Sequence, residues 1–179
     1  MKGMGTVRKL AIAVAVCMAV LCLPGYSEPT PEQIAERTKL LFEAVKNDDV
    51  EWVKLLINHG AYVNARVGNS ETILMYAISK DVADVLIKSG ADVNAKDNQG
   101  KTALMHAAYG NRADVTELLI KSGANVKAKD NLGKTALMYA RDTGSRRKDD
   151  IAILLRAAGQ RSKSKRPDIG ENTYFWRKL

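Results

Sequence analysis

The chain has few side chains whose chemistry could support catalysis. Its two histidines, His59 and His106, are of the type that ligates a metal or acts as a general base. They fall in copies of a repeated stretch that are not neighbours, so we do not expect them to share a metal ion. Both cysteines, Cys17 and Cys22, lie in the first apolar segment, and a chain without that segment has no thiol nucleophile.

Motifs typical of active sites are also missing from the sequence. It contains no glycine-rich phosphate loop and no HExxH or GxSxG pattern. Asp97 and Asp130 recur with a fixed period, and each of them, like Asp92, occupies a turn position that accounts for it without paired-carboxylate catalysis. We therefore predict that the protein is not an enzyme and has no catalytic, cofactor-binding or metal-ligating residues.

The same stretch of sequence occurs several times. Residues 97–129 read DNQGKTALMHAAYGNRADVTELLIKSGANVKAK, and 33 positions after Asp97 the text begins again at Asp130 with DNLGKTALMYA. Related copies lie upstream over residues 72–96 and, more diverged, over 40–65. A constant period of this length is typical of proteins built from stacked repeats, in which one unit cannot bury its apolar face alone.

Each copy combines a turn with two helices. In residues 97–100 the aspartate, asparagine and glycine are turn formers. We expect Thr102 to cap the following helix with its hydroxyl, and Val115 and Leu119 to belong to the apolar face of the second helix. Gly123 should end that helix in the left-handed conformation. The matching positions in the other copies hold Gly60, Gly90 and Gly159.

These copies resemble the ankyrin repeat, a β-turn finger followed by two antiparallel helices. The family's TPLH motif is replaced by TALM at Thr102 and Thr135 and by TILM at Thr72, so its proline and histidine are missing. The resemblance implies an all-α solenoid of stacked helix-turn-helix units with β-turn fingers. It covers a repeat domain over residues 28–159, with repeats at about 30–65, 66–96, 97–129 and 130–159.

Two copies differ in length from the third. Between Thr72 and Gly90 the second copy is three residues shorter than the third is between Thr102 and Gly123. The fourth copy, with Gly159 at the matching end, is three residues longer. We expect the loops between the helices to absorb both changes, because loops tolerate insertions and deletions best.

The first helix of the domain has a clear start signal. Thr30 is placed as the N-cap and Pro31 as the first helical residue, and the helix should run to about Asn47. We expect Arg37 to lie on its outer, solvated side.

The resemblance further implies that a protein partner meets the concave side, which is formed by the finger turns and the surfaces of the first helices. Carried over by position, the partner-binding residues are Asn69, Glu71, Lys96, Asn98, Gln99, Lys101, Tyr109, Lys129, Asn131, Leu132 and Lys134, with Ser79 and Asp142 as further first-helix positions.

Four of these residues are lysines that recur with the period, namely Lys96, Lys101, Lys129 and Lys134. We expect them to form a short lysine ladder, which would favour an acidic partner and mainly raise its association rate. The alternative is a solvated lysine face that serves solubility. Leu132 at a finger tip and Tyr109 on a first helix are candidate apolar anchors for the partner.

The N-terminus has the features of an export signal. A basic start precedes an apolar run of 14 residues over 10–23, which is short of the about 20 residues needed to span a membrane. Small residues lie at positions −3 and −1 of a cleavage point before Glu28. We predict a signal peptide over residues 1–27 and an exported protein, periplasmic or secreted from a bacterium; an uncleaved anchor is the alternative.

Positive charge is concentrated at the two ends of the chain. The formal net charge is +8, but residues 28–155 are balanced, because three Lys and Arg precede them and seven follow. A neutral repeat body gives no support to nucleic-acid binding, and we expect none.

The C-terminal tail, residues 160–179, is basic at first and ends with the adjacent aromatics Tyr174, Phe175 and Trp176. Its first half is typical of a flexible linker. Three alternatives stay open for its end: docking on the last repeat as a cap, binding to a partner or membrane surface, or disorder.

Two functional hypotheses follow from these features. The first is an exported protein–protein interaction module whose stacked repeats order the fingers before binding, so that little entropy is lost on docking. The second is a surface-associating protein that uses the basic and aromatic tail on anionic lipid or polymer.

Overall fold

The computed structural model describes residues 30–142 and 148–161. The predicted signal peptide, the tail beyond Arg161 and the centre of the enlarged fourth loop lie outside these ranges. From Pro31 on, the described residues belong to one unit of the chain. Its elements in chain order are α2 (Pro31–Lys46), α3 (Val50–Asn58), β1 (Arg66–Val67), β2 (Glu71–Thr72), the 3-10 helix η1 (Ile73–Tyr76), α4 (Lys80–Lys88), α5 (Ala103–Tyr109), α6 (Ala113–Lys121), α7 (Ala136–Asp142) and α8 (Lys148–Arg161).

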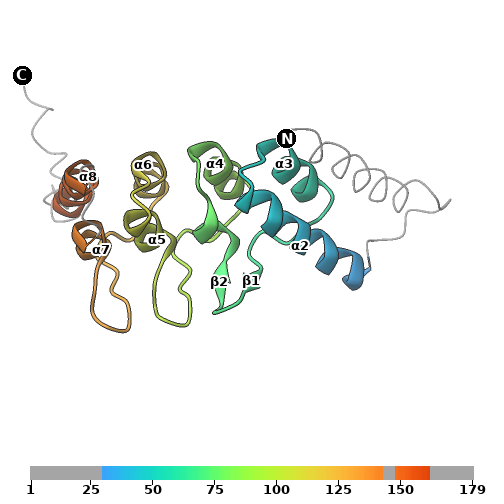
Figure 1. Ribbon diagram of the computed structural model, residues 1–179, viewed down its shortest axis with the longest axis horizontal. Coiled ribbons are helices and arrows are strands. Elements are labelled where there is room, and N and C mark those ends of the chain that lie inside the picture. The colour runs from blue at the N-terminus through green and yellow to red at the C-terminus, as the bar shows by residue number, and fades with distance from the viewer. Residues whose placement is uncertain (1–29, 143–147, 162–179) are drawn as a thin grey trace, which may run out of the picture. The chain divides into compact units, whose positions relative to one another are not determined.

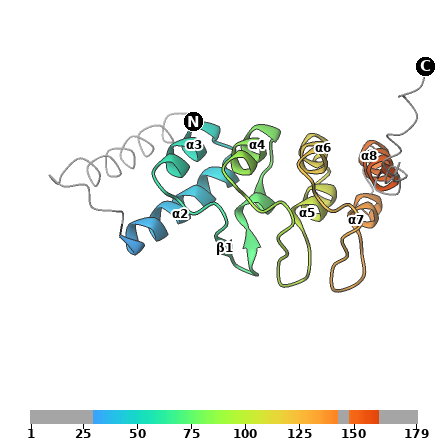
Figure 2. The same ribbon diagram turned by 180° about the vertical axis from the view of Figure 1, so that it is seen from behind.

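The helices form hairpins that stack side by side in two layers. Within the hairpins, α2 packs on α3, η1 on α4, α5 on α6 and α7 on α8. Between hairpins, the first helices contact one another from α2 through η1 and α5 to α7, and the second helices from α3 through α4 and α6 to α8. The finger turns project on the side of the first helices (Figures 1 and 2). This arrangement confirms the predicted all-α solenoid of helix-turn-helix units. Among the described residues, every helix is too short or too polar to cross a membrane.

Small side chains allow the first helices to approach closely. Ala107 and Ala108 of α5 are buried, and so is Ala140 of the neighbouring α7. Thr102 precedes α5 with extended backbone angles, as expected of an N-cap, but the expected hydroxyl bond is wrong: no hydrogen bond from its side chain caps the helix, and its buried Oγ1 has no partner in the described part of the chain.

The helix at the start of the domain follows its predicted limits closely, since it begins at Pro31 and ends at Lys46. The expected exposure of Arg37 is wrong. Its side chain is buried, and its guanidinium donates to the carbonyl of His59 at the end of α3. A cation at this position pairs with a carbonyl that the helix itself leaves without a partner.

Glycine ends the second helix in the first three repeats, as predicted. Gly60, Gly90 and Gly123 have φ angles of 85°, 89° and 87°. The prediction for Gly159 is wrong, because α8 continues through it to Arg161. The earlier helices must turn back toward the next finger, whereas α8 is followed by no further repeat within the described residues.

The three-residue deletion in the second repeat is absorbed by its first helix and not by the loop. The 3-10 helix η1 has four residues where α5 has seven. The connection to the second helix has three residues in both repeats, 77–79 and 110–112. These residues must cross from one helical layer to the other, and Arg112 ties both connections together by donating to the carbonyl of Ala77 at 2.8 Å. In the fourth repeat α7 keeps seven residues, and residues 143–147 lie outside the described ranges.

Asparagine side chains join consecutive repeats on the side of the second helices. Asn64 donates to the carbonyl of Gly90 at 2.9 Å and accepts from the N–H of Asp92 at 2.8 Å. Asn94 makes the same pair of bonds to Gly123 and Asn125 one repeat later. At the next junction Lys127 takes this position. A groove of about 630 Å³ lies there between α6 and α8, lined largely by apolar side chains such as Ile120, Ala124, Val126 and Leu154.

Candidate binding face

Each of the last two fingers is closed by one aspartate. Asp97 Oδ1 accepts hydrogen bonds from the backbone N–H groups of Gln99 and Lys101, both at 2.8 Å. Asp130 repeats this arrangement with the N–H groups 2.9 and 2.7 Å away, two and four residues further on. The turn role predicted for these aspartates is confirmed.

The second carboxylate oxygen of each aspartate ties the finger to its first helix. Asp97 Oδ2 lies 3.0 Å from His106 Nε2, and Asp130 Oδ2 accepts from the Tyr139 hydroxyl at 2.6 Å. His106 and Tyr139 are equivalent positions 33 residues apart. In the first finger Tyr76 holds this position, and its hydroxyl donates to Glu71. Every finger is therefore fastened to a polar ring of its own repeat.

These contacts shift the ionisation of the groups that make them. The Tyr139 hydrogen bond lowers the pKa of Asp130, against the effect of its burial. Burial, followed by the bond to Asp130 and its charge, raises the pKa of Tyr139 to about 12. The bond to Glu71 is the main cause that raises the pKa of Tyr76 to about 12. Both phenols therefore stay protonated, as hydrogen-bond donors, well above neutral pH.

The fingers are also joined to one another along their edges. The N–H of Asn98 donates to the carbonyl of Asn69 at 2.9 Å, and the N–H of Asn131 donates to that of Gln99 at 2.9 Å. The fit is close at Gly100, because a Cβ there would lie 2.5 Å from Oδ1 of Asn131. These contacts hold the three fingers in a fixed register.

Basic side chains reinforce the same edge. Arg66 donates to the carbonyl of Lys96 at 2.8 Å, and Lys96 Nζ donates to the carbonyl of Lys129 at 3.0 Å. Each cation therefore bonds to the backbone at the equivalent position of the next repeat. Sequence reasoning assigned Lys96 to a charged ladder and missed Arg66, which precedes it by one repeat length.

The other two lysines of the expected ladder gather on one ring. Lys101 Nζ lies 5.3 Å and Lys134 Nζ 5.6 Å from the centroid of Tyr139. Lys134 also pairs with Asp142 at 3.0 Å. A cation above an aromatic face is attracted by the ring quadrupole, which is negative over the face. The four lysines thus form two separate sets, one along the finger edge and one around Tyr139.

The predicted site residues differ in their access to solvent. Leu132 at a finger tip and Tyr109 on α5 are 81% and 65% exposed. Glu71, Lys101 and Lys134 are half-buried. The expected place of Ser79 on a first helix is wrong: η1 ends at Tyr76, and the half-buried Ser79 caps the second helix α4 by accepting from the N–H of Val82. The other predicted positions are exposed, namely Asn69, Lys96, Asn98, Gln99, Lys129, Asn131 and Asp142.

Sequence reasoning missed the polar rings that anchor the fingers. One signal could have found two of them: the spacing of nine residues from Asp97 to His106 is repeated from Asp130 to Tyr139. It also missed that Glu71 of the second repeat meets Asp97 and His106 of the third, because this contact joins different repeats.

The contact at Gly100 leads to a comparison of two alanine substitutions. Gly100 and Gly133 have nearly equal φ angles of 77° and 76°, so alanine should cost about 1 kcal/mol at either for the left-handed backbone. Only at Gly100 would the new Cβ also collide with the neighbouring finger. We expect Gly100→Ala to lower the unfolding free energy by at least roughly 1 kcal/mol more than Gly133→Ala in urea titrations. Equal losses would show that the fingers do not pack closely.

The raised pKa of Tyr139 predicts a pH dependence. A group whose pKa is higher when folded stabilises the fold below its unfolded pKa, 10.0 for tyrosine, and this contribution is lost as pH rises toward about 12. Tyr139→Phe should therefore be less stable than the parent at pH 8, and the difference should shrink between pH 10 and 12. Thermal melts at each pH measure this. A difference that grows with pH would contradict the assignment.

The family models agree with this architecture. A model described as ankyrin repeats, in three copies, matches residues 13–97 and 81–166. No curated protein matches the chain. Because the matched residues cover most of its length, the chain belongs to the ankyrin repeat family.

Proposed function

We propose that the protein is an exported interaction module that binds another protein with its finger face, meaning the finger turns together with the exposed surface of α5 and α7. Ankyrin repeats generally mediate protein–protein interaction. The observation that carries the proposal is the fastening of the fingers: each is bonded to its neighbour and to a ring of its own repeat. A surface ordered before binding loses little conformational entropy on docking.

The chemistry of the face favours a partner with an apolar patch bordered by acidic groups. Leu132 and Tyr109 expose apolar surface, and the Tyr109 ring is supported edge-on by Tyr139, with centroids 6.2 Å apart. Lys129 is exposed, and its ammonium has no partner within the described residues. Apolar anchors supply most of the affinity of such interfaces, whereas rim charges mainly set the association rate.

The two apolar anchors give the direct test. A partner would be isolated from an extract with the full chain, and its affinity then measured for Tyr109→Ser, Leu132→Ser and a control, Ile153→Ser. Ile153 is 61% exposed on α8, the second helix of its repeat. Because central anchors contribute about 2 kcal/mol or more, we expect roughly 30-fold weaker binding for each finger-face variant and no change for the control. Equal effects of all three substitutions would reject the finger face.

Export is proposed from the N-terminal segment alone and has its own test. The full-length chain would be expressed in a bacterium, followed by cell fractionation and mass measurement. We expect a mature chain that starts at Glu28 and lies outside the cytoplasm. An intact chain retained in the cytoplasm would reject export without affecting the finger-face proposal.

A further inference from the structure

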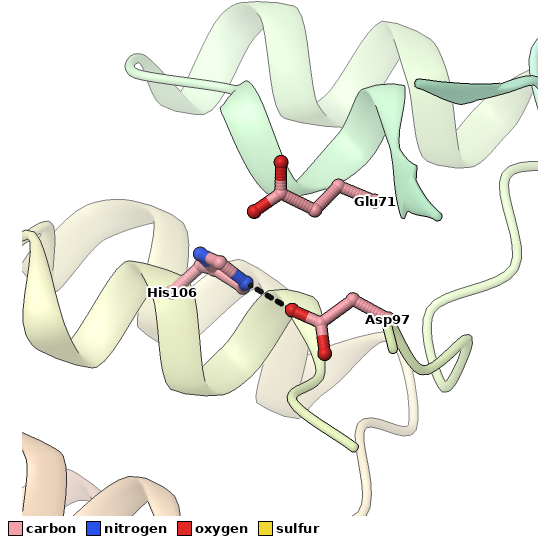
Figure 3. A group of neighbouring side chains, drawn as sticks. All are labelled: Glu71, Asp97 and His106. Carbon is pink, nitrogen blue, oxygen red and sulfur yellow. Dashed lines mark hydrogen bonds and ion pairs between the residues drawn. The ribbon is translucent and has the colours of Figure 1, made fainter. Parts of the chain in front are cut away.

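Three potential metal ligands meet at the junction of the second and third repeats. Glu71 lies on β2 of the first finger, Asp97 opens the second finger, and His106 lies on α5. One ligand atom from each lies within 4.8 Å of the other two, and Figure 3 shows the three groups turned toward one another. The Asp97 side chain is 2% exposed and that of His106 is 25% exposed, so the cluster is shielded but can be reached by a small ion.

Hydrogen bonds outside the cluster hold the two carboxylates in place. Asp97 Oδ1 is engaged by two backbone N–H groups, which direct Oδ2 toward His106. The Tyr76 hydroxyl donates to one oxygen of Glu71. Partners of this kind orient metal ligands in proteins, and metal sites depend on them strongly.

At the junction of the third and fourth repeats, lysines lie beside the equivalent residues and offset the negative charge of the aspartate. One repeat later Lys101 replaces Glu71, Asp130 replaces Asp97 and Tyr139 replaces His106. There the ammonium groups of Lys101 and Lys134 lie over Tyr139, and the charge of Lys101 favours the ionised form of Asp130. At the Glu71 junction no lysine or arginine pairs with either carboxylate in the described part of the chain. The carboxylates of Glu71 and Asp97 and the imidazole of His106 therefore have beside them no lysine or arginine of the described residues comparable to Lys101 at the next junction.

We propose that Glu71, Asp97 and His106 bind a divalent transition metal ion of the Zn²⁺ type. His106 supplies Nε2, Asp97 supplies Oδ2 and Glu71 supplies a carboxylate oxygen, and water completes the coordination. For His106 and Asp97 little movement is needed, since two ligands of tetrahedral zinc lie roughly 3.4 Å apart when each bond is about 2.1 Å, against 3.0 Å between Nε2 and Oδ2 now. The Glu71 oxygen lies within 4.8 Å of both and would complete the set of protein ligands. The ion would join the second repeat to the third.

This site goes beyond the expectation that the protein has no metal ligands. That expectation considered His59 and His106 as a pair. The partners that His106 meets are carboxylates from the neighbouring finger and from its own, and their approach depends on how the repeats stack.

Calorimetric titration of the metal-stripped full chain with Zn²⁺ tests the proposal. All proteins would carry Cys17→Ser and Cys22→Ser and no histidine tag, because free thiols and tags bind zinc. We expect one ion per chain. His106→Tyr should abolish zinc binding. The fold already contains a tyrosine at the equivalent position of the next repeat, Tyr139, which bonds to Asp130. Tyr76→Phe should weaken binding about 10-fold, since it removes only a ligand's outer hydrogen bond.

Two further variants make the outcome decisive. His59→Gln removes the other histidine and should bind zinc like the parent. Glu71→Lys introduces lysine, the residue found at the equivalent position of the third repeat, and should also abolish zinc binding. If circular dichroism shows His106→Tyr to be unfolded, Glu71→Lys takes its place in the test. The absence of zinc binding by the parent, or binding that persists in folded Glu71→Lys, would overturn the proposal.

Discussion

No repeat of this chain can bury its apolar face alone, and the contact between consecutive repeats is the constraint on which the rest depends. It explains why alanines line the facing sides of α5 and α7, where the helices approach closely. It also explains how the second repeat absorbs its deletion. The connection between layers keeps three residues, and the first helix becomes a single 3-10 turn. A shorter helix still presents Ile73, Leu74 and Met75 to the core, whereas a shorter connection could not join the two layers.

The aspartate of each regular finger links local and tertiary structure. One oxygen closes the turn, and the other reaches a ring on the first helix. The residue four positions after Asp97 or Asp130 is a lysine, and the ammonium groups of both lysines lie over the ring of Tyr139. The first finger lacks the aspartate and has Val67 there, with Glu71 bonded to Tyr76 instead. Small changes at these repeated positions alter the charge of each junction without altering the fold.

Rigidity and charge together shape what the finger face can do. The edge bonds between fingers engage backbone groups of Asn98 and Asn131, and the ammonium of Lys96 bonds to the next repeat. The tips, with Leu132 and the exposed amide of Asn98, stay accessible to a partner, whereas the Asn131 amide donates to the Asn98 carbonyl. A face of this kind presents a fixed pattern of apolar and amide groups, which suits recognition of a folded protein surface.

The sequence by itself determined the kind of structural unit that the described domain repeats. Local backbone preferences decide the turn aspartates, the helix start at Pro31 and the glycines at 60, 90 and 123. The aspartates recur after 33 residues and the glycines after 30 and 33, which makes them recognisable. Only the tertiary structure decided which lysines are engaged, that Arg37 is buried, and that Glu71 and Asp97 meet His106. Several of these contacts join residues about one repeat apart, such as Lys96 with the Lys129 carbonyl and Glu71 with His106, and Arg37 reaches from α2 to the end of α3. They depend on the register and tilt of neighbouring units, which local preferences do not specify.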